Sequence, residues 1–341
     1  MAGARIQADS TTARSSALLR RAGKYALTCS VLPGAFLAMA AMAPAAHAAT
    51  AAASATARIQ RLLDTPVNGT VNLPRGTFAV RPDLLLPHGE RIVGHGTTLR
   101  VASGSGNYTA MLAGASTSTD LSGLTITGVT FDQNTAGNPI GSVPALYKAP
   151  RFVLRILLGS GIKIIGDRFI GTDNVNTIVT GGGTSKVTIS HDVFKTINTP
   201  LHDHSSIYTS GTATVISDNT LTGTAAYFSA AIEVHGDQVR VTRNHISGYF
   251  RGANIVASDA TFTGNHVSGA GSPVDLWSVA PTALHNVRVT GNVLNRDLPY
   301  WKTIVQHLGL RMPAAGFTQQ VIRDTTSTLT FHAITVRGNA A

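Results

Sequence analysis

The chain has little cysteine, little glutamate and little helical periodicity. Cys29 is the only cysteine in 341 residues, so a disulfide framework is excluded. Helical periodicity is nearly absent outside the stretch Ala57 to Leu63, which excludes a helical fold. Glutamate is also rare, because only Glu90 and Glu233 occur. That scarcity makes Glu233, in the segment AAIEVHG, a candidate for chemistry and not simply one more solvated strand residue.

Residues 1–48 have the pattern of a secretory signal peptide. A basic region ending at Lys24 precedes an apolar run from Tyr25 to Met42, and small residues at Ala46 and Ala48 predict cleavage after Ala48. The run is broken by Pro33-Gly34 and no charged stop follows it, which excludes a membrane span. We therefore predict a secreted protein whose mature domain covers residues 49–341, with the ordinary secretory route and twin-arginine export both open.

The charge balance favours anionic partners. Removal of residues 1–48 takes away five basic residues and one acidic residue, and lowers the formal charge from +10 to +6. Such a surplus suits an acidic polysaccharide, although simple solubility explains it equally well. The basic residues are scattered singly without an aromatic–basic cluster, so a nucleic-acid partner is not expected.

The most informative feature of the sequence is a repeat. Seven segments share the pattern apolar-x-apolar-x-x-(Asn/Asp)-x-apolar, beginning with IKIIGDRF at Ile162. Successive copies are 21 to 27 residues apart, and the last gap of 47 fits two turns. Short alternating runs at this period predict a β-solenoid. The aligned polar positions are Asp167, Asp192, Asn219, Asn244, Asn265, Asn292 and Asn339.

The polar column has a mechanical explanation. Asn and Asp tolerate the left-handed backbone of a sharp bend, and their side chains can bond to the copy on the next coil. Both ends of such a stack need protection against pairing with other chains. The segment ARIQRLL predicts a short N-terminal capping helix, and the stretch from Asn295 to Phe331 interrupts the repeat near the other end.

These motifs resemble a known family. The segments GTVNLPRGTFAV from Gly69 and LLLPHGERIVGHGTTL from Leu84 are similar to the first coils of right-handed parallel β-helix proteins of the pectate lyase-like superfamily. The resemblance covers roughly residues 57–338 and implies an all-β domain formed by a single right-handed parallel β-helix. It does not specify the chemistry, because lyases, hydrolases, epimerases and phage adhesins share these coils.

Family signatures for specific reactions are missing. Gly94-His95-Gly96 superficially matches a polygalacturonase motif, but it lies at a structural position of the first coils and its partner aspartates are absent. The aspartate cluster that binds calcium in pectate lyases is also absent. We therefore expect no metal and no cofactor, and we expect a monomer.

Alignment of the second strand of each coil places Glu233 in an outward column. The aliphatic residues Ile178, Ile207, Ile232, Ile255 and Leu276 superpose and are expected to point inward. The residues that follow them form the predicted outward column of Val179, Tyr208, Glu233, Val256 and Trp277. His235 would share one patch with Glu233 and Tyr208.

Neighbouring turns add further polar groups to this predicted groove. LHDHSS supplies His202, Asp203 and His204, GYFRG supplies Tyr249 and Arg251, and Asp237 follows the Glu233 strand. Grooves of this composition bind sugars through aromatic faces and charged groups. We predict Glu233, His235, Asp203, Tyr208 and Arg251 as catalytic residues, and His202, His204, Trp277, Tyr249 and Asp237 as substrate-binding residues.

Two reactions on a polysaccharide, which we expect to be acidic, fit these residues. Glycoside hydrolysis needs two carboxyls, which Glu233 and either Asp203 or Asp237 would supply. Elimination from a uronic acid needs a base, for which Tyr208, His235 and His204 are candidates, and a cation such as Arg251 to stabilise the intermediate. A carbohydrate-binding surface protein and a sugar epimerase remain alternatives, and residues 202–204 fit a plain polar turn better than a metal site.

Overall fold

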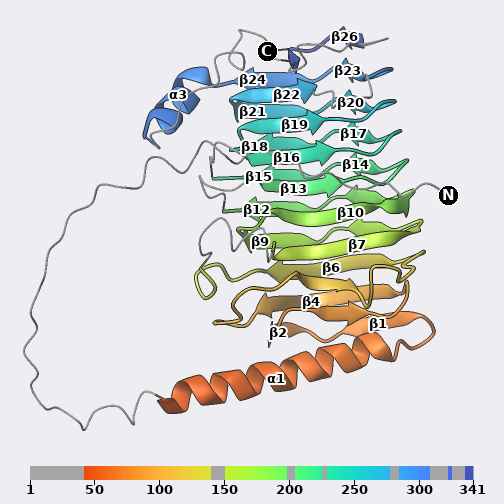
Figure 1. Cartoon of the computed structure of the whole chain (residues 1–341), viewed down its shortest axis with the longest axis vertical. Coiled ribbons are helices and arrows are strands. Elements are labelled where there is room, and N and C mark those ends of the chain that lie inside the picture. Colours follow the sequence, from red (N-terminus) through yellow and green to blue (C-terminus); the bar gives the residue numbers. More distant parts are fainter. Residues whose placement is uncertain are drawn as a thin grey trace, which may run out of the picture. The chain divides into compact units, whose positions relative to one another are not determined.

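The computed structural model describes residues 42–139, 150–197, 204–224, 229–276, 284–307, 322–324 and 335–340. Within these residues the chain forms a right-handed parallel β-solenoid of about eight coils. Figure 1 shows the coils stacked one on another, with the N-terminal helix at one end of the stack. The predicted all-β fold is confirmed, and the described residues from Ala45 onward belong to one compact unit.

Each coil contributes strands to parallel sheets. In the described residues a nine-stranded sheet consists of β3 (Leu84–Leu86), β5 (Ala110–Gly114), β7 (Phe152–Ser160), β10 (Asn176–Ser185), β13 (His204–Thr209), β16 (Ser229–Val234), β19 (Arg251–Ile255), β22 (Ser272–Leu276) and β25 (Ile322–Asp324). We call this the front sheet.

The remaining strands form two series of the second sheet. The series that follows the front sheet in each coil comprises β1 (Thr70–Leu73), β8 (Lys163–Ile165), β11 (Thr188–Ser190), β14 (Val215–Ser217), β17 (Arg240–Thr242), β20 (Thr261–Thr263), β23 (Arg288–Thr290) and β26 (Thr335–Arg337). The next series comprises β2 (Gly76–Val80), β9 (Arg168–Thr172), β12 (Val193–Thr196), β15 (Thr220–Thr222), β18 (His245–Ser247), β21 (His266–Ala270) and β24 (Val293–Arg296). The long strands β4 (Arg91–Val101) and β6 (Thr125–Asp132) run through both series.

The interior is filled by stacks of like residues. The central residues of β11, β14 and β17 are buried; they are Ile189, Ile216 and Val241. Phe169 lies between two other phenylalanines, with ring centroids 5.3 Å from Phe131 and 4.8 Å from Phe194. Parallel strands with matched register place equivalent side chains directly above one another, so the repeat in sequence becomes a repeat in packing.

The predicted polar column forms a buried ladder between coils. The backbone N–H of Asn219 donates to Asn244 Oδ1 at 3.0 Å, and the N–H of Asn244 donates to Asn265 Oδ1 at 2.9 Å. The Nδ2 of Asn219 donates to the carbonyl of Ile189 at 3.0 Å. The predicted bond to the next coil is thus confirmed. The left-handed residue, however, is the preceding one, such as Arg243 with φ 55°, because the Asn side chain itself must point inward.

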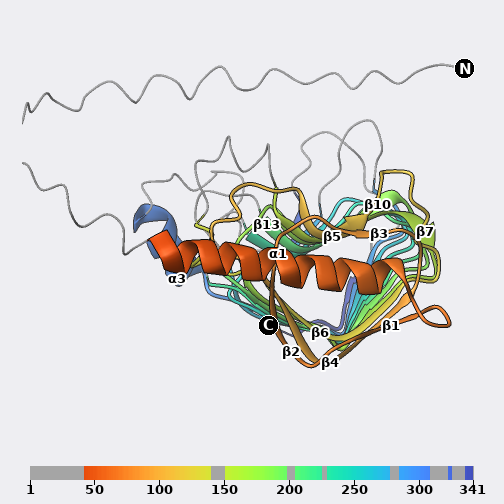
Figure 2. The same cartoon turned by 90° about the horizontal axis from the view of Figure 1, so that it is seen from below.

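The N-terminal helix is longer than predicted. Helix α1 extends over Met42–Asp64, beyond the expected 57–63, and includes the predicted cleavage point after Ala48. Ile59 and Leu63 of α1 are buried in the core. The Gln60 side chain accepts from the N–H of Leu85 at 2.9 Å and donates to its carbonyl at 2.8 Å. Figure 2 shows α1 lying across the end of the stack. The helix therefore covers the first coil and supplies hydrogen-bond partners to its otherwise unpaired backbone groups.

The interrupted stretch near the C-terminus contains helix α3 (Leu298–His307). Its Trp301 is completely buried, packs edge-on against Phe250 at 5.3 Å and donates from Nε1 to the carbonyl of Gly269 at 2.7 Å. A Cβ on Gly271 would lie 2.3 Å from the Phe250 ring, so only glycine fits there. Helix α3 therefore covers the side of the last coils. Among the described helices, neither has the length and apolarity that crossing a membrane requires.

Candidate functional site

The carboxylate of Glu233 lies at the centre of a hydrogen-bonded cluster on the outer face of the front sheet. Its strand, β16, buries Ile232 and Val234 and leaves the Glu233 side chain 16% exposed. The Ser205 hydroxyl donates to Glu233 Oε2 at 2.5 Å. Asn254 Nδ2 lies 3.4 Å from Oε1. Three successive strands thus fix one carboxylate.

His235 is the second component of the cluster. Its Nε2 lies 2.8 Å from Glu233 Oε1, and its side chain is 28% exposed. Because a carboxylate accepts hydrogen bonds, Nε2 carries the proton in this pair and Nδ1 is the other ring nitrogen. The Tyr208 ring packs on the imidazole with centroids 4.8 Å apart and an interplanar angle of 30°. The geometry is that of a histidine oriented by a carboxylate.

The ionisation of Glu233 reflects these neighbours. Burial acts to raise the pKa of Glu233. The hydrogen bonds from His235 and Ser205, together with the charges of His235 and Arg251, outweigh it. The pKa of this carboxyl is therefore below its ordinary value of 4.5. A carboxylate that stays ionised is suited to orient a neighbouring base.

Asn254 and Asp275 continue the column on the next two coils. The register pairs Tyr208 with Glu233, Glu233 with Asn254, and Asn254 with Asp275. The prediction placed Val256 and Trp277 at the positions that Asn254 and Asp275 occupy. It is wrong by two residues on each strand. The cause is that the small Ala253, and not Ile255, pairs with Ile232.

A cation lies at the edge of the cluster. Arg251 donates from Nε to Asp275 Oδ2 at 2.9 Å and is 23% exposed. Asp275 is 1% exposed and also accepts from the hydroxyl of Ser272. Arg251 sits over the Phe250 ring, 5.5 Å from its centroid. Its guanidinium is therefore held in place beside the carboxylate cluster.

Two predicted substrate-binding residues lie inside the coil instead of on its surface. Tyr249 is 1% exposed, and its hydroxyl bonds to Ser206 Oγ at 2.7 Å and to Thr196 Oγ1 at 3.1 Å. Burial raises the pKa of Tyr249 to about 12. His204 is 2% exposed, with Nδ1 2.6 Å from the carbonyl of Asn174. Neither side chain reaches the outer face, because each completes a buried polar network.

Of the other predicted residues, one lies on the surface and three lie outside the described residues. Asp237 is exposed at a corner, where its Oδ1 accepts from the N–H of Ser258 at 3.0 Å. His202, Asp203 and Trp277 lie outside the described residues. The structure therefore brings together Glu233, His235, Tyr208 and Arg251.

Ser205, Asn254 and Asp275 complete the cluster and were not predicted. The corner residues carry a signal that could have found Asn254, because it precedes Asn265 by the same number of residues as Glu233 precedes Asn244. The interval from Asp275 to Asn292 is longer, so the same count does not find Asp275. Among the residues that the structure describes, no group of three or more histidine, aspartate, glutamate or cysteine side chains is placed to hold a metal ion.

No protein-family model and no curated protein sequence matches this chain. Among solved structures, the chain is similar to a tailspike protein mutant of E. coli bacteriophage HK620, with a TM-score of 0.65 and 16% identity over 84% of this chain. The match spans about half of the tailspike chain, 52% of its length.

Two further solved structures are similar at lower scores. The A-module of a mannuronan C-5 epimerase from Azotobacter vinelandii has a TM-score of 0.43 and 14% identity over 84% of this chain and 91% of its own. An endo-xylogalacturonan hydrolase from Aspergillus tubingensis has a TM-score of 0.44 and 15% identity over 71% and 82%. The match to the tailspike protein agrees with the right-handed parallel β-helix described above, and at this identity it concerns the fold alone.

Proposed function

We propose that this protein is an exported enzyme that cleaves a uronate-containing polysaccharide by β-elimination at the Glu233 cluster. The observation that carries the proposal is the 2.8 Å hydrogen bond between His235 and the Glu233 carboxylate, with Tyr208 stacked on the same imidazole. A base, an orienting carboxylate and a phenol in contact are the groups that proton transfer at carbon requires. The β-helix fold is compatible with this activity and does not by itself imply it.

Each residue has one role in the proposed reaction. His235, held by Glu233 through Nε2, uses Nδ1 to remove the proton from the carbon next to the sugar carboxylate. The electron pair forms a double bond as the neighbouring carbon–oxygen bond breaks, and the leaving oxygen takes a proton from Tyr208. Arg251 and Asn254 stabilise the charge that develops on the substrate carboxylate. No water is consumed, and one product carries an unsaturated sugar.

Hydrolysis is less well supported by the same geometry. A glycosidase needs one carboxyl that stays protonated to assist the leaving group, whereas the pKa of Glu233 is lowered. Among the described residues, the carboxyl in register with Glu233 is that of Asp275, which is buried and engaged by Arg251 and Ser272. In elimination, the ionised Glu233 is the form that orients His235.

The test uses three soluble polyuronates: polygalacturonate, polyglucuronate and a copolymer of mannuronate and guluronate. We expect new ultraviolet absorbance from an unsaturated uronate on at least one of them. His235→Gln should reduce the rate about 100-fold or more, the typical contribution of a positioned base. Glu233→Gln should reduce it less, because the base remains but is no longer oriented. His266→Gln, at an exposed histidine of β21, is the matched control and should retain the wild-type rate.

Three results would contradict the proposal. Reducing ends without ultraviolet absorbance would establish hydrolysis. Binding without either signal would establish an adhesive protein. A wild-type rate in His235→Gln would remove the proposed base from the reaction.

A further inference from the structure

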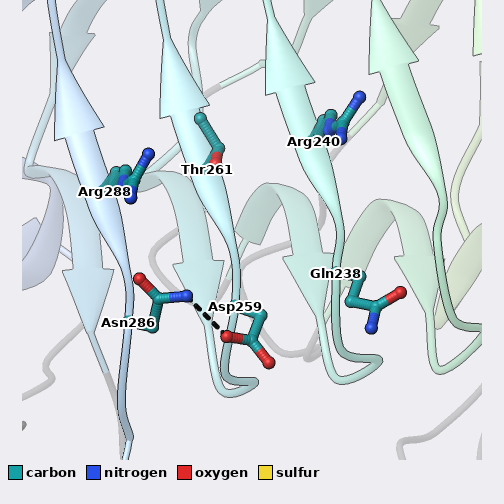
Figure 3. Close-up of a pocket in the computed structure, with 6 residues that line it drawn as sticks. All are labelled: Gln238, Arg240, Asp259, Thr261, Asn286 and Arg288. Atoms are coloured by element: carbon teal, nitrogen blue, oxygen red, sulfur yellow. Dashed lines mark hydrogen bonds between the residues drawn. The ribbon is translucent and has the colours of Figure 1, made fainter. Parts of the chain in front are cut away.

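A second polar surface lies on the series of strands that follows the front sheet. Its residues flank the central residue of each strand: Arg240, Thr242, Thr261, Thr263, Arg288, Thr290, Thr335 and Arg337. We call it the arginine–threonine surface. Register places Arg240, Thr261, Arg288 and Thr335 in one column along the stack. Figure 3 shows Arg240 and Arg288 extending from this face with Thr261 between them.

The surface contains two adjoining hollows. One, of about 240 Å³, is lined by Gln238, Arg240, Asp259, Thr261, Asn286 and Arg288. The other, of about 410 Å³, is lined by Thr261, Thr263, Arg288, Thr290, Thr335 and Arg337. Thr261 and Arg288 belong to both. The hollows therefore form one continuous trough that runs from coil to coil.

The trough carries unneutralised positive charge. Arg243 and Arg251 are paired with aspartates at 2.8 and 2.9 Å, whereas Arg240, Arg288 and Arg337 form no ion pair with any residue in the described part of the chain. The one acid of the lining, Asp259, accepts a hydrogen bond from Asn286 Nδ2 at 2.7 Å, which Figure 3 marks. Three arginines against one acid make the trough complementary to an anion.

The spacing of these charges suits a linear polyanion lying along the stack. Arg240 and Arg288 are separated by two coils, about 9.6 Å at the usual strand spacing. Threonine hydroxyls lie between the cations, and those of Thr263 and Thr290 are 3.0 Å apart. A linear glycan advances by a similar distance per sugar as the solenoid does per coil. Arginines would then meet carboxylates on alternate sugars, and threonines would meet the hydroxyls between them.

We propose that the arginine–threonine surface binds a carboxylated linear polysaccharide without acting on it chemically. A nucleic acid fits less well, because single strands bind through aromatic stacking platforms and the lining residues include no aromatic side chain. The proposal does not depend on elimination at Glu233, since none of these residues belongs to that cluster. The arginine–threonine surface would retain the protein on an acidic polysaccharide matrix.

A chemical footprint tests the surface locally. Phenylglyoxal modifies accessible arginines, and peptide mass spectrometry reads each site separately. Polygalacturonate should slow modification of Arg240 and Arg288 at least threefold, whereas Arg168, an exposed arginine of β9, should react at an unchanged rate. Equal protection of Arg168, protection by neutral dextran, or the same protection by a single-stranded DNA oligonucleotide would each overturn the proposal.

Paired variants test whether the arginines provide affinity. Arg240→Gln/Arg288→Gln should weaken binding to immobilised polygalacturonate about tenfold, as expected when two exposed ion pairs are lost. Arg168→Gln/Lys195→Gln removes the same charge from exposed positions of β9 and β12 and should change binding less than twofold. Equal losses of affinity in the two double variants would show that only net charge matters, and would refute the proposal that this surface binds the polysaccharide. Elimination activity is measured on both, so a failure of binding and a failure of catalysis are distinguished.

Discussion

The first two members of the polar ladder are acids where the later members are amides. Each later amide donates from Nδ2 to a carbonyl of the preceding coil, as Asn244 does to Ile216 at 3.0 Å. Asp192 and Asp167 have no such N–H, and their Oδ2 atoms are buried without a hydrogen-bond partner among the described residues. Burial raises the pKa of Asp167 to about 7, and burial with the adjacent Asp167 charge raises that of Asp192. Both are therefore proton-binding sites in the folded state.

This arrangement predicts that folding stability falls as pH rises. The folded pKa of Asp167 is about 7 and its ordinary value is 3.8. The folded chain thus holds more protons than the unfolded chain between these values, and the slope of stability against pH is negative there. The difference corresponds to about 4 kcal/mol, fully lost above pH 7. Asp167→Asn/Asp192→Asn should remove this loss and restore two donors, each worth about 1 kcal/mol.

Guanidinium unfolding of wild type and the double variant at pH 4, 6 and 8 measures the effect. The variant should gain about 4 kcal/mol or more on wild type between pH 4 and pH 8, because all other titrating groups cancel in the comparison. Asp218→Asn is the control, since this aspartate is only partly buried and its hydrogen bond to Arg243 lowers its pKa. It should produce the opposite, smaller trend. Parallel curves for wild type and the double variant would refute the assignment of buried protonated acids.

Three further predictions follow from packing and charge. Phe169→Ala empties the middle of the stack formed with Phe131 and Phe194, and should cost about 3 to 5 kcal/mol in the same unfolding assay. Asn244→Ala leaves buried backbone groups of two coils unpaired, and should cost about 3 kcal/mol; a cost below 1 kcal/mol would mean that the ladder is dispensable. Because the folded pKa of Glu233 is lowered, its ionised form stabilises the fold above pH 4.5. The stability advantage of wild type over Glu233→Gln should shrink on acidification and not on alkalinisation.

The fold could be predicted from the sequence because each coil of a solenoid repeats the same sequence pattern. Seven copies of one pattern fix the coil length, and the corner residues from Asp167 to Asn339 occupy equivalent places. Short-range patterns were less informative at the N-terminus. The alanine-rich segment before Ala57 shows little amphipathic pattern, yet α1 extends through it.

The site was predicted only in part, because the register of the front sheet is ambiguous from aliphatic residues alone. Ile232 and Val234 both point inward, as do Ala253 and Ile255 on the next strand. A shift of two residues therefore preserves the inward pattern, whereas a shift of one would reverse it. Aligning Ile255 with Ile232 concealed Asn254 as the neighbour of Glu233.

Buried polar side chains were the other source of error. Tyr249 and His204 have the composition of sugar-binding residues, and sequence does not distinguish an outward tyrosine from one that completes an internal network with Ser206. The burial of these groups depends on residues 30 to 53 positions away, which only the coiling of the chain brings into contact.

The mass of the fragments released from a polyuronate tests the central claim most directly. If His235 and Glu233 carry out elimination, the two fragments of each cut will together equal the mass of the parent chain, and one will carry an unsaturated end. Fragments that together exceed the parent by one water would contradict the account, because they would show that the bond is broken by hydrolysis and not by elimination.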